Sequence, residues 1–241
     1  MDGTNNYHRL IEEAVRLLAE GDPEQGATLL FDAWSRDREN ADLAVSYACL
    51  LARIGREAEA EELFAALADE SPGDARVWNN WGFLLLERGE VGGAVEKLRR
   101  ALELEPDDFE SLVNLAIALD RGGDSGAALS HYRRAVEINP ESSVAYNNMG
   151  AALWRSGRAE EALDAFRVAL AINPRDASAA NNMGIVKMAG DDHAEAAAFF
   201  RQALEIDPAG PAAARNLKAA KKRLSASGKE KKPCEKPPSL F

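Results

Sequence analysis

The sequence Trp78-Asn79-Asn80-Trp81-Gly82 recurs at multiples of 34 residues, and this recurrence decides the fold. The later copies read Tyr146-Asn147-Asn148-Met149-Gly150 and Ala180-Asn181-Asn182-Met183-Gly184. A 34-residue frame with Gly82 at its eighth position needs no insertion or deletion. Its six units are residues 7–40, 41–74, 75–108, 109–142, 143–176 and 177–210. Below, a position means the place of a residue within its unit.

The frame predicts a close crossing of two helices in every unit. Positions 8 and 20 hold only Ala or Gly, namely Ala14, Ala48, Gly82, Ala116, Gly150 and Gly184, then Gly26, Ala60, Ala94, Ala128, Ala162 and Ala196. Position 24 is always large: Leu30, Phe64, Leu98, Tyr132, Phe166 and Phe200. Small residues let two helices approach, and the large residue fills the space beside the crossing.

Breaks in the pattern predict where each helix ends. Each unit has two amphipathic stretches of about 14 residues, with apolar residues at helical spacing. Between them stands a Gly that suits a left-handed helix end, except that the sixth unit has Asp191: the glycines are Gly21, Gly55, Gly89, Gly123 and Gly157. Position 32 is Pro in five units and Arg38 in the first, and Pro stops a helix. A single helix pair cannot bury its apolar face, so the units must stack.

The pattern Trp78, Trp81-Gly82, Leu85, Ala94, Leu98, Ala101 and Pro106 resembles the tetratricopeptide repeat. The resemblance implies an all-α, right-handed α-solenoid of six stacked helix-turn-helix repeats. Residues 1–6 form an N-terminal lead in this interpretation. Residues 211–224 continue the first-helix pattern and read as a capping helix, and the Lys- and Pro-rich residues 225–241 read as a disordered basic tail.

Composition narrows the range of partners. The 241 residues include 40 Asp and Glu against 29 Lys and Arg, a net charge of −11, which disfavours general nucleic-acid binding. Residues 211–241 hold nine Lys or Arg and two Glu, and any membrane contact is expected only through the basic tail, residues 225–241. With two cysteines, no apolar run of about 18–20 residues and no signal-peptide pattern, we expect a cytoplasmic protein.

The resemblance also implies a concave groove lined by the first helix of each repeat, through positions 2, 5, 6, 9, 12 and 13. One Asn side chain can pair with both the N–H and the C=O of an extended peptide unit. Asparagine recurs at positions 5 and 6 of successive repeats, and this row of side chains resembles the asparagine ladder in the repeat region of O-linked N-acetylglucosamine transferase. The alternative is that these Asn side chains bond to the neighbouring repeat. Position 6 supplies Asn80, Asn114, Asn148, Asn182 and Asn216, and position 5 supplies Asn79, Asn147 and Asn181, with Val113 interrupting.

Other groove positions suggest a partly apolar ligand. The apolar candidates are Phe83, Val113, Ile117, Trp154, Ile185 and Met188. Trp154 has packing against the next repeat as its alternative role. The groove-edge candidates for anion contacts are Arg53, Arg121 and Arg155, whose alternative is solvated surface charge. Position 5 holds no Lys, which argues against the clamp that related repeats use for chaperone carboxylates.

No arrangement of residues predicts catalysis. His8, His131 and His193 occupy three different positions in three units, and no metal-ligand spacing or phosphate loop occurs. We therefore expect no catalytic residue, metal, cofactor or small-molecule substrate. The predicted function is a non-catalytic protein–protein interaction scaffold, a monomer or weak homo-oligomer, that binds an extended peptide of a partner protein. The alternative is a self-assembling structural, coat or adaptor protein that oligomerises through its groove.

Overall fold

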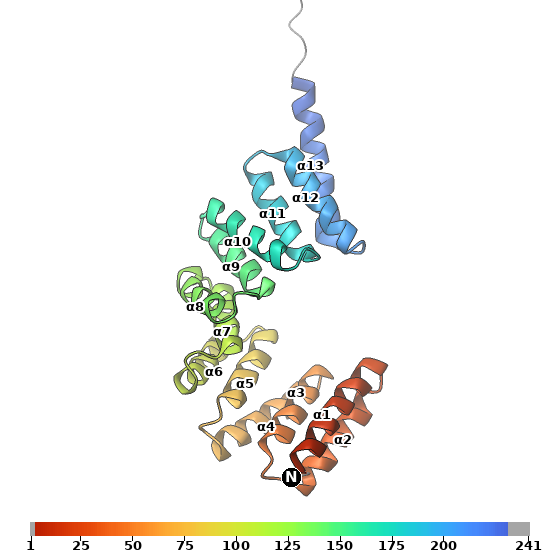
Figure 1. Ribbon diagram of the computed structural model, residues 1–241, viewed down its shortest axis with the longest axis vertical. Coiled ribbons are helices and arrows are strands. Elements are labelled where there is room, and N and C mark those ends of the chain that lie inside the picture. Colours follow the sequence, from red (N-terminus) through yellow and green to blue (C-terminus); the bar gives the residue numbers. More distant parts are fainter. Residues whose placement is uncertain (1–2, 231–241) are drawn as a thin grey trace, which may run out of the picture. The chain divides into compact units, whose positions relative to one another are not determined.

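The structure is a computed structural model that describes the backbone of residues 3–230 and the side chains of residues 6–226. This part of the chain forms thirteen α-helices and no strand (Figure 1). None of these helices is both long and apolar enough to cross a membrane. The helices are α1 (Gly3–Glu20), α2 (Pro23–Arg36), α3 (Ala41–Arg53), α4 (Glu57–Glu70), α5 (Ala75–Glu87), α6 (Val91–Leu104), α7 (Phe109–Arg121), α8 (Ser125–Ile138), α9 (Ser143–Arg155), α10 (Ala159–Ile172), α11 (Ala177–Ala189), α12 (His193–Ile206) and α13 (Pro211–Glu230).

The helices repeat with the period of the sequence. From α3 onward the first helices begin at residues 41, 75, 109, 143, 177 and 211, and from α4 the second helices begin at 57, 91, 125, 159 and 193. The predicted all-α repeat fold is confirmed. The glycines between paired helices have φ between 77° and 90°, and Asp191 takes the same left-handed conformation with φ 63°.

The core consists of the predicted small-and-large crossings. Every residue at positions 8 and 20 is buried, and the large residues at position 24 are at most 2% exposed. A Cβ added to Gly184 would lie 2.5 Å from the Phe200 ring, and one added to Gly150 would lie 2.7 Å from the Phe166 ring. Glycine at these two sites therefore lets the aromatic ring touch the helix backbone.

Side-chain caps fix where the first helices begin. The carboxylate of Asp108 accepts a hydrogen bond from the Ser111 backbone N–H at 2.7 Å, and that of Asp176 accepts one from the Ala179 N–H at 2.9 Å. Asn40, Asp74 and Ser142 cap α3, α5 and α9 in the same way. These residues all stand at position 34, so each of the first five repeats ends with the cap of the next helix, whereas the sixth ends with Gly210.

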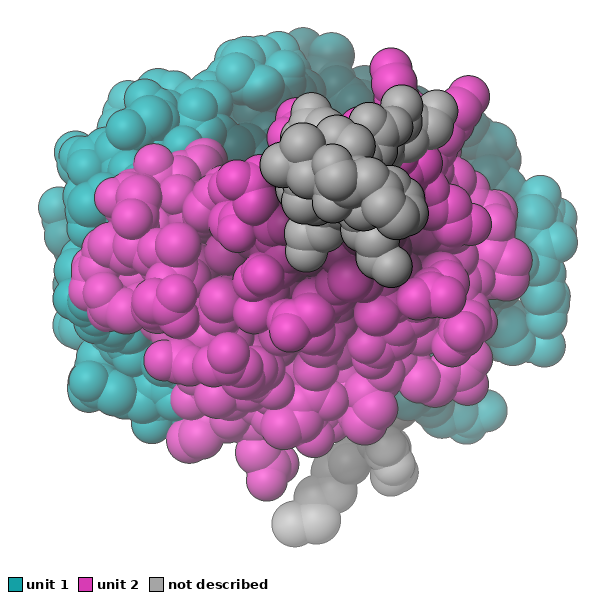
Figure 2. Space-filling view, turned by 90° about the horizontal axis from the view of Figure 1, so that it is seen from above, with its two compact units in different colours: residues 1–138 teal, residues 139–241 magenta. Residues whose placement is uncertain are grey.

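The chain divides into two compact units, residues 1–138 with helices α1–α8 and residues 139–241 with the helices from α9 onward (Figure 2). Within each unit the first helices of successive repeats contact one another. The described second helices contact first helices only. Because the first helices lie closer together, each unit curves toward its first-helix face, the surface formed by the odd-numbered helices.

Both ends of the repeat region are more helical than expected. Helix α1 begins at Gly3, inside the predicted lead, and α13 continues to Glu230, six residues past the predicted end of the capping helix. Helix α13 thus includes residues 225–230 of the predicted tail, since extending a helix that has already formed costs less than starting one. The remainder of the predicted tail, residues 231–241, lies outside the described residues.

Candidate functional site

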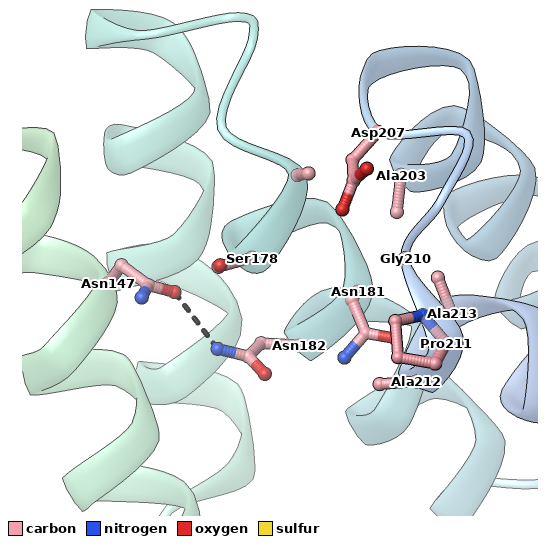
Figure 3. A pocket seen from close by; sticks show the side chains of 11 residues that line it. Asn147, Ser178, Asn181, Asn182, Ala203, Asp207, Gly210, Pro211, Ala212 and Ala213 are labelled. Atoms are coloured by element: carbon pink, nitrogen blue, oxygen red, sulfur yellow. Dashed lines mark hydrogen bonds between the residues drawn. The ribbon is translucent and has the colours of Figure 1, made fainter. Parts of the chain in front are cut away.

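Asparagine side chains pair along the first-helix face in a repeating register. The Asn114 side-chain Nδ2 donates to Asn79 Oδ1, Asn182 Nδ2 donates to Asn147 Oδ1, and Asn216 Nδ2 donates to Asn181 Oδ1. All three hydrogen bonds measure 3.0 Å. In each, position 6 of one repeat meets position 5 of the repeat before it. Figure 3 shows the Asn147–Asn182 pair between α9 and α11.

Each pair leaves hydrogen-bonding capacity unused. The bond takes one N–H of the position-6 amide and one lone pair of the position-5 oxygen. The position-6 oxygen, its second N–H and the position-5 NH2 group have no other bond to a described residue. None of these atoms is among the fully buried polar atoms without a partner. The amides are therefore fixed in orientation by the neighbouring repeat. Five of the six are partly open to solvent, whereas Asn79 is only 6% exposed.

Two asparagines of the same row behave differently. Asn80 follows a repeat with Val45 at position 5, so it has no amide to pair with. Its Nδ2 donates instead to the Arg76 carbonyl at 2.8 Å, and the Cys49 thiol donates to its Oδ1 at 3.4 Å. Asn148 forms no side-chain hydrogen bond within the described part of the chain. The predicted row is thus three amide pairs, one amide bound locally and one unpaired amide.

A pocket of about 430 Å³ with a mixed polar and apolar lining opens beside two of the amide pairs in the unit of residues 139–241. Asn147, Asn181 and Asn182 line it together with the first turns of α11 and α13. Figure 3 shows Asp207 above Asn181 and Pro211, which lie next to each other in this view. The lining offers amide donors and acceptors and one carboxylate, which suits a peptide main chain better than an apolar group.

A second pocket, of about 410 Å³, lies in the unit of residues 1–138 and is more apolar. We call it the Cys49 pocket. Burial raises the pKa of the Cys49 thiol to about 11, against the opposing effect of Arg53, so this thiol is neutral at pH 7. The lining residues are Cys49, Ala52, Arg53, Glu57, Phe64, Asn80, Phe83, Leu84 and Glu87. Sequence reasoning missed Cys49. The available signal was its place at position 9, one of the positions expected to line the groove.

The predicted apolar groove residues differ in how open they are. Phe83 is 46% exposed, whereas Val113 is only 9% exposed and offers little surface to a ligand. Ile185 and Met188 pack against the buried cluster around Phe200 and Ala220. Ile117 and Trp154 are half-buried. Phe83 is therefore the most accessible of the predicted apolar contacts.

The three predicted arginines also differ. Arg121 donates to the Leu86 carbonyl at 3.0 Å and lies 3.7 Å from the Glu87 carboxylate, so it caps the end of α5. Arg53 is exposed and forms no ion pair or hydrogen bond with any described residue. Arg155 is exposed at the end of α9. Of the two predicted arginines in the unit of residues 1–138, Arg53 is therefore the one whose charge is free for a ligand.

Solved structures share the fold at low sequence identity. A chain of the APC/C hetero-tetramer Cut9–Hcn1 matches with a TM-score of 0.76 and 18% identity, over 88% of this chain and 42% of that one, so this chain spans less than half of it. PilF of Pseudomonas aeruginosa has a TM-score of 0.73 at 18% identity, over 89% and 96% of the two chains. YrrB, described as a TPR protein with an unusual peptide-binding site, has a TM-score of 0.62 at 21% identity, over 78% and 97%.

Sequence comparison gives the family. No curated protein matches the sequence. One tetratricopeptide repeat model matches residues 17–79, and a second matches residues 80–143 and 147–211. These ranges cover well over half of the chain and carry the helix pairs whose starts recur every 34 residues. By both its sequence and its helix pairs, the chain is a member of the tetratricopeptide repeat family.

Proposed function

We propose that the chain is a non-catalytic scaffold whose first-helix face binds an extended peptide segment of a partner protein. The observation that carries this proposal is the register of three amide pairs, Asn114–Asn79, Asn182–Asn147 and Asn216–Asn181. Each pair presents an oriented donor and acceptor toward solvent, and an extended peptide presents the same two groups along its main chain.

The pairing itself supports binding because it pre-orients the amides. A free Asn side chain loses rotamer freedom when it captures a ligand, whereas an amide already held by the preceding repeat has less freedom to lose. The amide pairs therefore stabilise the repeat stack and prepare it for a ligand at the same time. The likeness to YrrB is consistent with this proposal, since that protein is described as having a peptide-binding site.

The test compares two sets of asparagine variants of the full chain. A partner segment is first captured from lysate and mapped to a minimal peptide on an array. A triple variant should bind that peptide at least about 10-fold more weakly, since each substitution removes a hydrogen bond to the peptide worth about 0.5–1.5 kcal/mol. The triple variant carries Asn114→Ala, Asn182→Ala and Asn216→Ala.

The matched control is Asn173→Ala. Asn173 is an exposed asparagine between α10 and α11; its Oδ1 accepts a hydrogen bond from the Arg175 backbone N–H at 3.1 Å, and it lines neither pocket. This variant should change the affinity for the peptide less than 3-fold. A folded triple variant that binds the peptide as tightly as the wild type would refute the proposed role of the pairs.

A further inference from the structure

The Cys49 pocket lies on the first-helix face but lacks the amide pair found in other repeats. Val45 replaces the position-5 asparagine, and the Asn80 amide is turned back onto its own helix. What remains is a pocket between α3, α4 and α5. Here the first-helix face has a cavity that could take a side chain, but few groups that could form hydrogen bonds with the main chain of a peptide.

The lining of the pocket is apolar inside and charged outside. Phe64 and Leu84 are 1% and 4% exposed, and they line the pocket together with Ala52 and the half-exposed Phe83. The thiol of Cys49 and the oxygen of Asn80 satisfy each other. Its volume of about 410 Å³ is within the range of pockets that hold a ligand group.

The charges at the mouth are unequally matched. Glu57 lies 3.9 Å from Arg88, which also pairs with Glu61 and Glu90, and Glu87 lies 3.7 Å from Arg121. Arg53 has no such partner within the described residues. Arg53 is therefore the charged group of the lining that an acidic residue of a ligand can pair with.

We propose that the Cys49 pocket holds one large apolar side chain of the bound peptide, and that Arg53 pairs with an acidic residue next to it. This inference rests on the proposed function and adds the side-chain preference that the amide pairs cannot supply. A buried apolar anchor beside a matched charge is the arrangement that dominates many binding interfaces.

Disulfide capture at Cys49 tests the pocket without a known partner. The full chain carries Cys234→Ser, which leaves Cys49 as its single thiol. The probes are symmetric disulfides of small thiols bearing a benzyl, isobutyl, acetamide, carboxybenzyl or aminomethylbenzyl group. Cys49 displaces one probe thiol and keeps the other as a mixed disulfide, and the fraction captured under fixed reductant is read by intact mass.

The expected result is a preference for apolar probes. The benzyl and isobutyl probes should be captured at about 10- to 100-fold lower concentration than the acetamide probe. Phe83→Ala should weaken benzyl capture several-fold, and its exposed position keeps the fold intact. Equal capture of the acetamide and benzyl probes would overturn the apolar anchor.

The charged probes test the second half of the proposal. The carboxybenzyl probe should be captured several-fold better than the aminomethylbenzyl probe. Arg53→Glu should reverse that order, whereas the same charge change in Arg36→Glu, outside the pocket lining, should leave it unchanged. Better capture of the ammonium probe by the wild type would overturn the role of Arg53.

The two proposals can fail separately. If Cys49 shows no preference for apolar probes and the triple asparagine variant binds the peptide weakly, the proposal for the Cys49 pocket is refuted and the proposed function stands. If Cys49 prefers apolar probes and that variant binds the peptide normally, the proposal for the Cys49 pocket stands and the role of the amide pairs is refuted.

Discussion

At the scale of single residues, the contact between Gly184 and Phe200 shows how tightly the crossings are packed. Ala fills the same position beside Phe64 and Tyr132 in other repeats, so the local backbone decides which crossing needs glycine. A Cβ on Gly184 would lie 2.5 Å from the Phe200 ring and would force the ring or the helix to move. Gly184→Ala should therefore destabilise the protein by about 1–3 kcal/mol, as measured by urea unfolding.

Gly92→Ala is the control for this substitution. Gly92 lies in α6 and has no atom within 4 Å of an added Cβ. Alanine there should be neutral or stabilise the helix by up to about 1 kcal/mol. If the two variants unfold at the same urea concentration, the close packing at Gly184 is contradicted.

The Cys49 thiol makes a pH prediction at the same scale. Its pKa is about 11 in the folded chain, above the usual 8.5 or so, because burial disfavours the thiolate. Between about pH 9 and pH 11 the unfolded chain releases this proton and the folded chain keeps it, so the free energy of unfolding falls as pH rises.

Cys49→Ser keeps a donor for Asn80 and does not ionise in this range. Its urea midpoint should fall less between pH 7.5 and pH 10 than that of the wild type, whereas Cys234→Ser should match the wild type. Equal pH dependence in Cys49→Ser and the wild type would show that the thiol is not held neutral by burial.

At the scale of helices, the caps at position 34 define the repeat boundary. Asp108→Ala removes the acceptor for the Ser111 N–H and should cost about 1 kcal/mol. Asp108→Asn keeps an acceptor and should lose less than half of that, as measured by thermal melting followed by circular dichroism. If Asp108→Ala melted no lower than Asp108→Asn, the cap would contribute nothing to the start of α7.

Helix ends also mark where sequence reasoning stopped. Asn40, Asp74, Asp108, Ser142 and Asp176 are all good cap residues, so the cap row was readable from the sequence. The extension of α13 was less readable. Composition suggested a tail after residue 224, whereas Ala and Lys continue a helix that packing of Ala213 and Ala220 has already nucleated.

At the scale of the whole molecule, we propose that α13 closes the end of the repeat stack. Its Ala220 is fully buried against the cluster that contains Phe200 and Ala197. A chain that ends at residue 210 should lose this cover, melt at least about 5 °C lower and aggregate in light scattering. A chain that ends at residue 226 should behave like the wild type. Equal melting of both truncated chains would refute this role.

The period of the sequence was enough to predict the fold, since small and large residues recur at fixed places in six units. The candidate site was only partly predictable. The asparagine row was visible, but its pairing joins side chains 35 residues apart and depends on how successive helices are offset. The Cys49 pocket also depends on three helices together, and one repeat pattern at a time does not reveal it.

The central claim is that the amide pairs hold the main chain of an extended peptide. The most direct measurement is a backbone N-methyl scan of the mapped partner peptide, with affinities measured for the full chain and for the triple asparagine variant. Methylation at alternate residues that face the pairs should weaken wild-type binding by about 5- to 10-fold at each site, because it removes one main-chain donor. The triple variant should lose this sensitivity. Equal loss in both proteins, or no loss at any residue, would contradict the account.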